Sequence, residues 1–171
     1  MILERGDGPG LLAANGQSWR CVSDQVMGGV SAGRLERCAL DGEAALRLTG
    51  VVRLENNGGF VQMALDLAAR GAVLDATGYA GLRLRVRGNH APYNLHLRSA
   101  DMSAVWQSWR ASFKAVPEWH DLVIPFADFE PHRTELAVDP ARLTRLGLVA
   151  IGREMEVDLA LARLEFVARL P

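Results

Sequence analysis

The chain has 171 residues, a formal net charge of −1 and an apolar fraction of 49%. This balance excludes a disordered chain, a strongly basic nucleic-acid binder and a membrane-binding surface of one charge sign. No apolar run approaches the ~18 residues that cross a bilayer, and no secretory segment is recognisable at the N-terminus. We therefore expect one cytoplasmic domain over residues 1–171, with no membrane insertion and no nucleic-acid partner.

The first distinctive segment is SDQVMGGVSAG, at residues 23–33. A strand does not need glycine at this density, and each glycine would destabilise a helix, so the segment is predicted to be a shaped loop. Polar residues and glycines are expected to tie and bend this loop, namely Asp24, Gly28, Gly29 and Ser31. Apolar residues are expected to pack it against the core, namely Val26, Met27 and Val30.

A second loop, LENNGGF at residues 54–60, lies between two apolar-patterned runs. Asn56 and Asn57 tolerate left-handed backbone conformations, which predicts a tight or bulged hairpin turn. Two carboxamides beside a carboxylate and the ring of Phe60 can also hold a polyol or a peptide backbone. The turn and the ligand site are both open interpretations of this pattern.

Period-two alternation of apolar and polar residues, typical of strands with one buried face, recurs along the chain. The expected strands are 34–40, 44–52, 60–67, 82–86, 93–97, 106–113, 119–126 and 146–151. Segment 66–81 is expected to be a short helix or an irregular crossover, and segment 157–170 a strand, with a helix as the alternative. Many short strands with little helix predict an all-β sandwich or barrel.

The runs 82–86 and 93–97 are separated by GNHAP, so they are predicted to form an antiparallel hairpin whose apolar residues face the core. Their polar residues would then share the outer face with Phe60, and with Trp109 or Arg110 according to the register of that strand. Arginines that have no acidic side chains nearby favour an interaction surface. A sheet face that is simply exposed to water would show the same alternation of apolar and polar residues. The candidate binding residues are Asn56, Asn57, Phe60, Arg85, Arg87, Asn94, His96, Arg98 and Trp109.

The sequence contains no recognisable catalytic constellation of the zinc-protease helix type or the phosphate-loop type. Asp24 and Glu55 could act as the carboxylate pair of a glycosidase, or each could serve its own loop by accepting hydrogen bonds. Cys21 and Cys38 are expected to be buried free thiols. We expect no enzyme activity, no metal and no cofactor.

Five motifs follow one another in the chain: SDQVMGGVSAG, LENNGGF, GLRLRVRGN, YNLHLRS and WHDLVIPFADFEP. Together they resemble the complex I intermediate-associated protein family, over about residues 19–168. The resemblance implies a jelly-roll β-sandwich like the galactose-binding domains. Trp19 and Trp119, at the starts of strands, are expected to seal the ends of its core.

The resemblance also implies a protein-binding role, as an assembly factor for NADH:ubiquinone oxidoreductase (complex I) or for another protein complex. Its partners would be respiratory complex subunits, which would place the protein in the cytoplasm or, through a partner, at the inner membrane. Because the chain starts almost directly at the domain, unlike the mitochondrial members, the organelle role is not carried over. The alternative function is a carbohydrate-binding module of galactose-binding-like fold.

Overall fold

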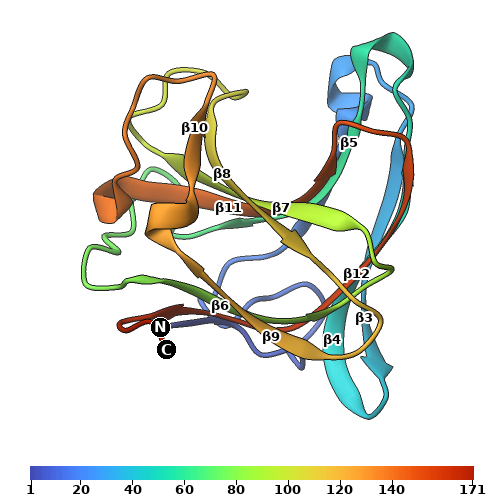
Figure 1. Cartoon of the computed structure of the whole chain (residues 1–171), viewed down its shortest axis with the longest axis horizontal. Coiled ribbons are helices and arrows are strands. Elements are labelled where there is room, and N and C mark those ends of the chain that lie inside the picture. Colours follow the sequence, from blue (N-terminus) through green and yellow to red (C-terminus); the bar gives the residue numbers. More distant parts are fainter.

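Two antiparallel sheets of six strands each lie face to face in a computed structural model that describes residues 1–171 (Figure 1). The predicted all-β sandwich is confirmed. Both termini lie at the same sheet, because β1 pairs with β12 and the chain ends shortly after β12.

Sheet I has the strand order β3-β4-β12-β6-β9, with β1 beside β12. Its strands are Ile2–Glu4 (β1), Ala32–Leu40 (β3), Glu43–Val52 (β4), Gly81–Arg87 (β6), His120–Pro125 (β9) and Met155–Val167 (β12). The hairpin between β3 and β4 turns through Asp41 and Gly42, which both have positive φ, as a two-residue turn of this kind requires.

Sheet II has the strand order β10-β8-β7-β11-β5-β2. Its strands are Arg20–Ser23 (β2), Phe60–Asp66 (β5), Pro92–Ser99 (β7), Ser108–Lys114 (β8), Glu130–His132 (β10) and Leu143–Ile151 (β11). Four short 3-10 helices connect strands: Asp24–Met27 (η1), Glu55–Asn57 (η2), Phe126–Asp128 (η3) and Pro140–Arg142 (η4).

One continuous hydrophobic core of 33 buried residues fills the space between the sheets. The alternating apolar residues of β6 and β7 all lie in it, as their pattern predicts: Leu82, Leu84, Val86, Tyr93, Leu95 and Leu97. Trp19 is also buried there, and its indole N–H donates to the buried carboxylate of Glu4 at 2.7 Å. The prediction that Trp19 seals the core is therefore confirmed.

The predicted hairpin between residues 82–86 and 93–97 is wrong. β6 belongs to sheet I and β7 to sheet II, so the connection at 88–91 carries the chain from one sheet to the other. The amides of Gly88 and His90 donate to the β8–β9 connection, at Val116 and Ala115, and not across a hairpin turn. Both strands do turn their apolar residues to the core, but they do so from opposite sides of it.

Two other expectations about elements are settled by the structure. Residues 157–167 lie in β12, so the preferred strand is confirmed over the helical alternative. The segment between β5 and β6 contains turns but no helix, as an irregular crossover would.

Candidate functional site

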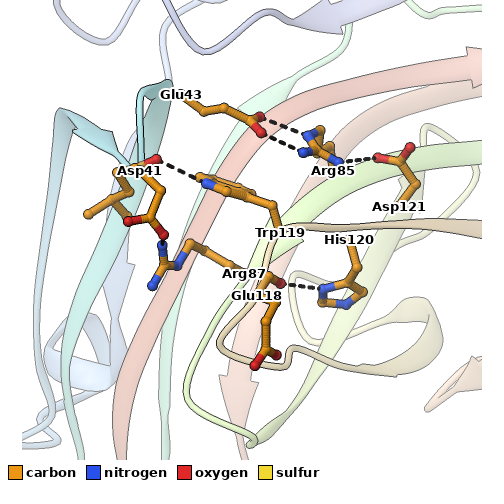
Figure 2. A network of polar contacts seen from close by, with 9 residues as sticks. Asp41, Glu43, Arg85, Arg87, Glu118, Trp119, His120 and Asp121 are labelled. Atoms are coloured by element: carbon orange, nitrogen blue, oxygen red, sulfur yellow. Dashed lines mark hydrogen bonds and ion pairs between the residues drawn. The ribbon is translucent and has the colours of Figure 1, made fainter.

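Arg85 and Arg87 lie on the outer face of sheet I, where acidic side chains surround them (Figure 2). The Arg85 guanidinium binds the Glu43 carboxylate through two hydrogen bonds and also contacts Asp121 at 3.3 Å. Arg87 forms an ion pair with Asp41 of the β3–β4 turn. The prediction that these two arginines lack compensating acids is therefore wrong.

Trp119 lies on the same outer face, not in the core as predicted. Arg85 and Arg87 each place their guanidinium carbon 5.9 Å from the centre of its ring, and its indole N–H donates to the Leu40 carbonyl. Below the ring is a second, small apolar cluster that it shares with Ala45, Ala160 and Ala162. Small alanines leave room on this face for a ring and two arginine stems, so Trp119 covers the outside of the sheet.

The remaining polar residues of the predicted surface lie on the outer face of sheet II. Asn94, His96 and Arg98 alternate along β7 with the buried core residues. Phe60 begins β5 on the same face and is half-buried. Four of the nine candidate residues thus share this face, namely Phe60, Asn94, His96 and Arg98, whereas Arg85 and Arg87 lie on the opposite outer face and Asn56 and Asn57 lie in η2.

Trp109 does not belong to that surface. Only 1% of it is exposed, and its indole N–H donates to the Leu136 carbonyl at 2.9 Å. Arg110 takes the outer position instead, directly opposite His96. The sequence carried a signal for this register, since Trp109, Ala111 and Phe113 form one apolar series and Arg110 belongs to the alternate polar one.

Arg98 and Arg110 are half-buried on the outer face of sheet II and have no acidic partner. Burial lowers the pKa of both guanidinium groups, and neighbouring arginines lower them further. The Arg98 Nε has no hydrogen-bond partner at all. By contrast, the arginines on the outer face of sheet I all form ion pairs: Arg34, Arg47, Arg83, Arg85, Arg87 and Arg163.

His96 lies between these groups as a neutral side chain. Burial, together with the charges of Arg110 and His132, lowers the pKa of His96 to about 3. Its Nε2 has no hydrogen-bond partner within the chain. This nitrogen is buried and therefore not open to a ligand, and the neutral ring adds no further charge beside the two arginines at neutral pH.

Two groups of loops stand beyond the strand ends of sheet II, so we call this outer face the flanked face (Figure 1). One group contains the connections 100–107 and 133–139, and it exposes Val105 and Trp106. The other contains η1, η2 and the β11–β12 turn at 152–154. At the first group, pockets of about 420 and 330 Å³ open side by side and share Asp66, Ala100, Thr144 and Arg145.

Asp24 joins the two glycine-rich loops at the other end of the flanked face. Its fully buried carboxylate accepts hydrogen bonds from the amide and hydroxyl of Ser31 and from the amides of Gly59 and Phe60. Burial alone would raise the pKa of Asp24, but these hydrogen bonds outweigh burial and hold the pKa below its usual value. The predicted tie within the first loop is confirmed, and it extends to the second loop.

The glycines around Asp24 make this tie possible. A Cβ at Gly29 would lie 2.4 Å from the Asp24 Cγ, and one at Gly58 would lie 2.5 Å from its Oδ2. Gly28 has φ of 86° and closes η1 in the left-handed region. Asn56 and Asn57 also have positive φ, as their residue types predict, and the Asn56 amide donates to the Gly28 carbonyl. The predicted hairpin turn is nevertheless wrong, because β4 belongs to sheet I and β5 to sheet II, so this loop crosses between the sheets.

The apolar residues of the first loop do not pack against the core as predicted. Val26 and Met27 are 73% and 64% exposed, and Val30 is exposed as well. The reason is that the buried carboxylate of Asp24, and not an apolar contact, anchors the loop. Its apolar side chains are thereby left on the surface beside the flanked face.

Asp24 and Glu55, which the sequence suggested as a catalytic carboxylate pair, do not face a common cleft. Both oxygens of Asp24 are buried and hydrogen-bonded, whereas the Glu55 carboxylate is exposed and pairs with Arg53. No three His, Cys, Asp or Glu side chains gather where they could hold a metal ion.

Both cysteines are free, but Cys21 is exposed and Cys38 half-buried, so their predicted burial is wrong. No helix is long and apolar enough to span a membrane.

The fold is that of β-sandwich carbohydrate-binding modules with the galactose-binding-like jelly roll, as predicted. The family 11 module of a Clostridium thermocellum cellulosomal cellulase superposes with a TM-score of 0.78 at 10% identity, covering 100% of this chain and 95% of its own. The same type of module in complex with a β-1,3-1,4-mixed-linked tetrasaccharide gives 0.74 at 11% identity, with coverages of 97% and 94%. A family 30 module of a C. thermocellum cellulase gives 0.66 at 14% identity, with coverages of 96% and 97%.

The sequence itself identifies the family. Residues 13–161 match the family described as Complex I intermediate-associated protein 30 (CIA30), and the chain belongs to that family. No curated protein matches it. The resemblance seen in the five motifs is thus confirmed.

Proposed function

We propose that the chain is a non-enzymatic binding module which holds a segment of a partner protein on the flanked face, and that it acts in the assembly of complex I or of another protein complex. The observation that carries this proposal is the contrast between the two outer faces. The arginines of sheet I are neutralised within the chain, whereas Arg98 and Arg110 of sheet II are half-buried without a carboxylate. A partner that supplies negative charge would satisfy them.

The composition of the flanked face favours a protein ligand. Arginines on the inner strands β7 and β8, with exposed apolar residues in the loops beyond both strand ends, resemble protein interfaces, in which arginine and large apolar side chains are enriched. Six strands at a spacing of ~4.8 Å make the face about 24 Å long across the strands. An extended segment of roughly seven residues, at ~3.4 Å per residue, would span that length.

Membership of the CIA30 family supports a role in assembly, since the family is described by association with a complex I intermediate. On this proposal the protein stabilises a partly built complex by covering a segment that is unpaired at that stage. The acidic character of that segment follows from the charge of the flanked face.

Capture of partners from gently solubilised host membranes and from cytosol tests the proposal. The wild type should retain respiratory-complex subunits or one other defined set of proteins, whereas the Arg98→Glu, Arg110→Glu variant should lose them. A matched control is Arg5→Glu, Arg169→Glu, which makes the same charge change at exposed arginines next to β1 and β12 of sheet I. Equal capture by all three proteins, each shown to be folded, would reject the flanked face as the binding surface.

Carbohydrate binding is a second candidate, and the fold of the module relatives together with the exposed ring of Trp106 favours it. Sugar rings commonly stack on exposed aromatic side chains, but the outer positions of the sheet II strands carry only one, the half-buried Phe60. Binding to a panel of soluble β-glucans, measured with the wild type and Trp106→Ala, separates the two candidates. Saturable binding that Trp106→Ala abolishes would establish the sugar function.

A further inference from the structure

The flanked face contains two arginines directly opposite each other on neighbouring strands. Arg98 of β7 is paired in register with Arg145 of β11, and both side chains lie on the outer face. Residues in this relation have Cβ atoms about 5 Å apart, so like charges there repel each other. A sheet retains such a pair at a cost unless an anion lies between the two groups.

The one carboxylate beside this pair is already engaged. Asp66 of β5 lies opposite Arg145 and accepts from its Nε at 2.9 Å, and it also binds the guanidinium of Arg20 through two hydrogen bonds. Arg98 forms neither a hydrogen bond nor an ion pair with Asp66. The four side chains Arg20, Asp66, Arg98 and Arg145 together carry a net charge of +2.

Arg98 is poorly satisfied by the rest of the chain. One terminal nitrogen donates to the Ala104 carbonyl at 3.0 Å, while the buried Nε has no partner. Burial and the charge of Arg145 both lower the pKa of Arg98, which shows that this cation is less stable here than in water. An oxyanion next to it would gain charge-assisted hydrogen bonds.

There is space for such a group beside both guanidinium groups. A pocket of about 330 Å³ is lined by Asp66, Arg98, Ser99, Ala100, Met102, Val105, Thr144 and Arg145. Its polar side is formed by Arg98 and Arg145 together with Asp66, Ser99 and Thr144, and the connection after β7 adds Ala100, Met102 and Val105 as an apolar side. The pocket can therefore accept an anion that carries an apolar neighbour.

We infer that this pocket binds a carboxylate of the partner segment, which bridges Arg98 and Arg145 while an adjacent apolar side chain packs against Met102 and Val105. The inference rests on the proposed function and names the chemistry that anchors the segment. A carboxylate fits because its two coplanar oxygens match the planar guanidinium donors. Its single negative charge also offsets the arginine that Asp66 leaves unpaired.

A short peptide probe tests the carboxylate site directly. The probes are acetyl-Leu-Asp-Leu-amide, its Asn counterpart and inorganic phosphate, each titrated into the ¹⁵N-labelled full chain by NMR. The Asp peptide should shift the amides around Arg98 and Arg145, with an affinity about tenfold higher than that of the Asn peptide, as charge-assisted hydrogen bonds predict. Arg98→Gln and Arg145→Gln should each remove that preference, whereas Arg169→Gln should retain it.

The outcomes separate this inference from the proposed function. One outcome is that a partner is captured without dependence on Arg98 and that the Asp and Asn peptides bind with equal affinity. This outcome would overturn the carboxylate site but would still support a binding module. Phosphate binding that depends on both arginines, without any preference for the Asp peptide, would also overturn it. A carboxylate preference lost in both Gln variants would support the site even if no partner protein were captured.

Discussion

Asp24 illustrates how one buried charge can hold two loops together. Its carboxylate accepts four hydrogen bonds, and these come from both glycine-rich loops. The first loop ends at residue 33 and the second begins at residue 54, so the two loops are more than 20 residues apart in the sequence. A buried carboxylate is tolerated only when donors surround it, so this network is satisfied as a unit or not at all.

Asp24→Asn is expected to lower the free energy of unfolding by about 3 kcal/mol, because the amide group places a donor against the backbone N–H groups that now donate to the carboxylate. Urea unfolding measures this loss. A change below about 0.5 kcal/mol, as for an ordinary surface substitution, would contradict the role assigned to Asp24.

The same residue predicts a pH dependence. The pKa of Asp24 is below its ordinary value of 3.8 in the folded chain, so its contribution is present above that value and is lost as the pH falls through the folded-state pKa. Urea midpoints between pH 5 and pH 2 should therefore decrease more steeply for the wild type than for Asp24→Asn. Parallel curves would show that Asp24 is not the group that titrates.

At the scale of elements, the two glycine-rich loops are joined into one hydrogen-bonded unit, because their glycines leave room for Asp24. Gly58→Ala would place a Cβ 2.5 Å from the Asp24 Oδ2 and is expected to destabilise the fold by about 2 kcal/mol or more. Gly78→Ala is the control, since a Cβ there meets nothing within 4 Å. Thermal unfolding of the two variants compares them, and equal melting temperatures would contradict the close packing around Asp24.

Strand pairing marks the limit of what the sequence could predict. The alternation in β6 and β7 correctly assigned the buried side chains, because the period of a strand decides which residues share a face. It could not decide between a hairpin within one sheet and a crossover between two, since both bury the same residues. That choice depends on contacts with β12 and β11, which are far away in the sequence.

The candidate site was also predictable within each strand but not between strands. Asn94, His96 and Arg98 were correctly grouped because they alternate along one strand, whereas Arg85 and Arg87 were placed on the wrong face with the wrong hairpin. Their acidic partners, Asp41 and Glu43, are brought close only by the order of strands in sheet I. No local pattern could have shown this pairing.

For the whole molecule, the two faces differ in how their charges are balanced. Binding surfaces often retain groups that do not help the free protein fold. Arg98→Gln, Arg110→Gln should therefore leave the free energy of unfolding unchanged within about 1 kcal/mol, or raise it, because unpaired half-buried cations are removed. Chemical denaturation tests this, and a loss of several kcal/mol would assign the two arginines a structural role.

The central claim is that partners bind the flanked face and not the ion-paired face of sheet I. Site-specific photo-cross-linking tests it most directly, with a benzophenone side chain at Ser112 on the outer face of β8 or at Thr49 on the outer face of β4. Cross-links to a captured partner from position 112, and none from position 49, are the predicted result. Cross-links from position 49 alone would contradict the account and move the binding surface to the opposite sheet.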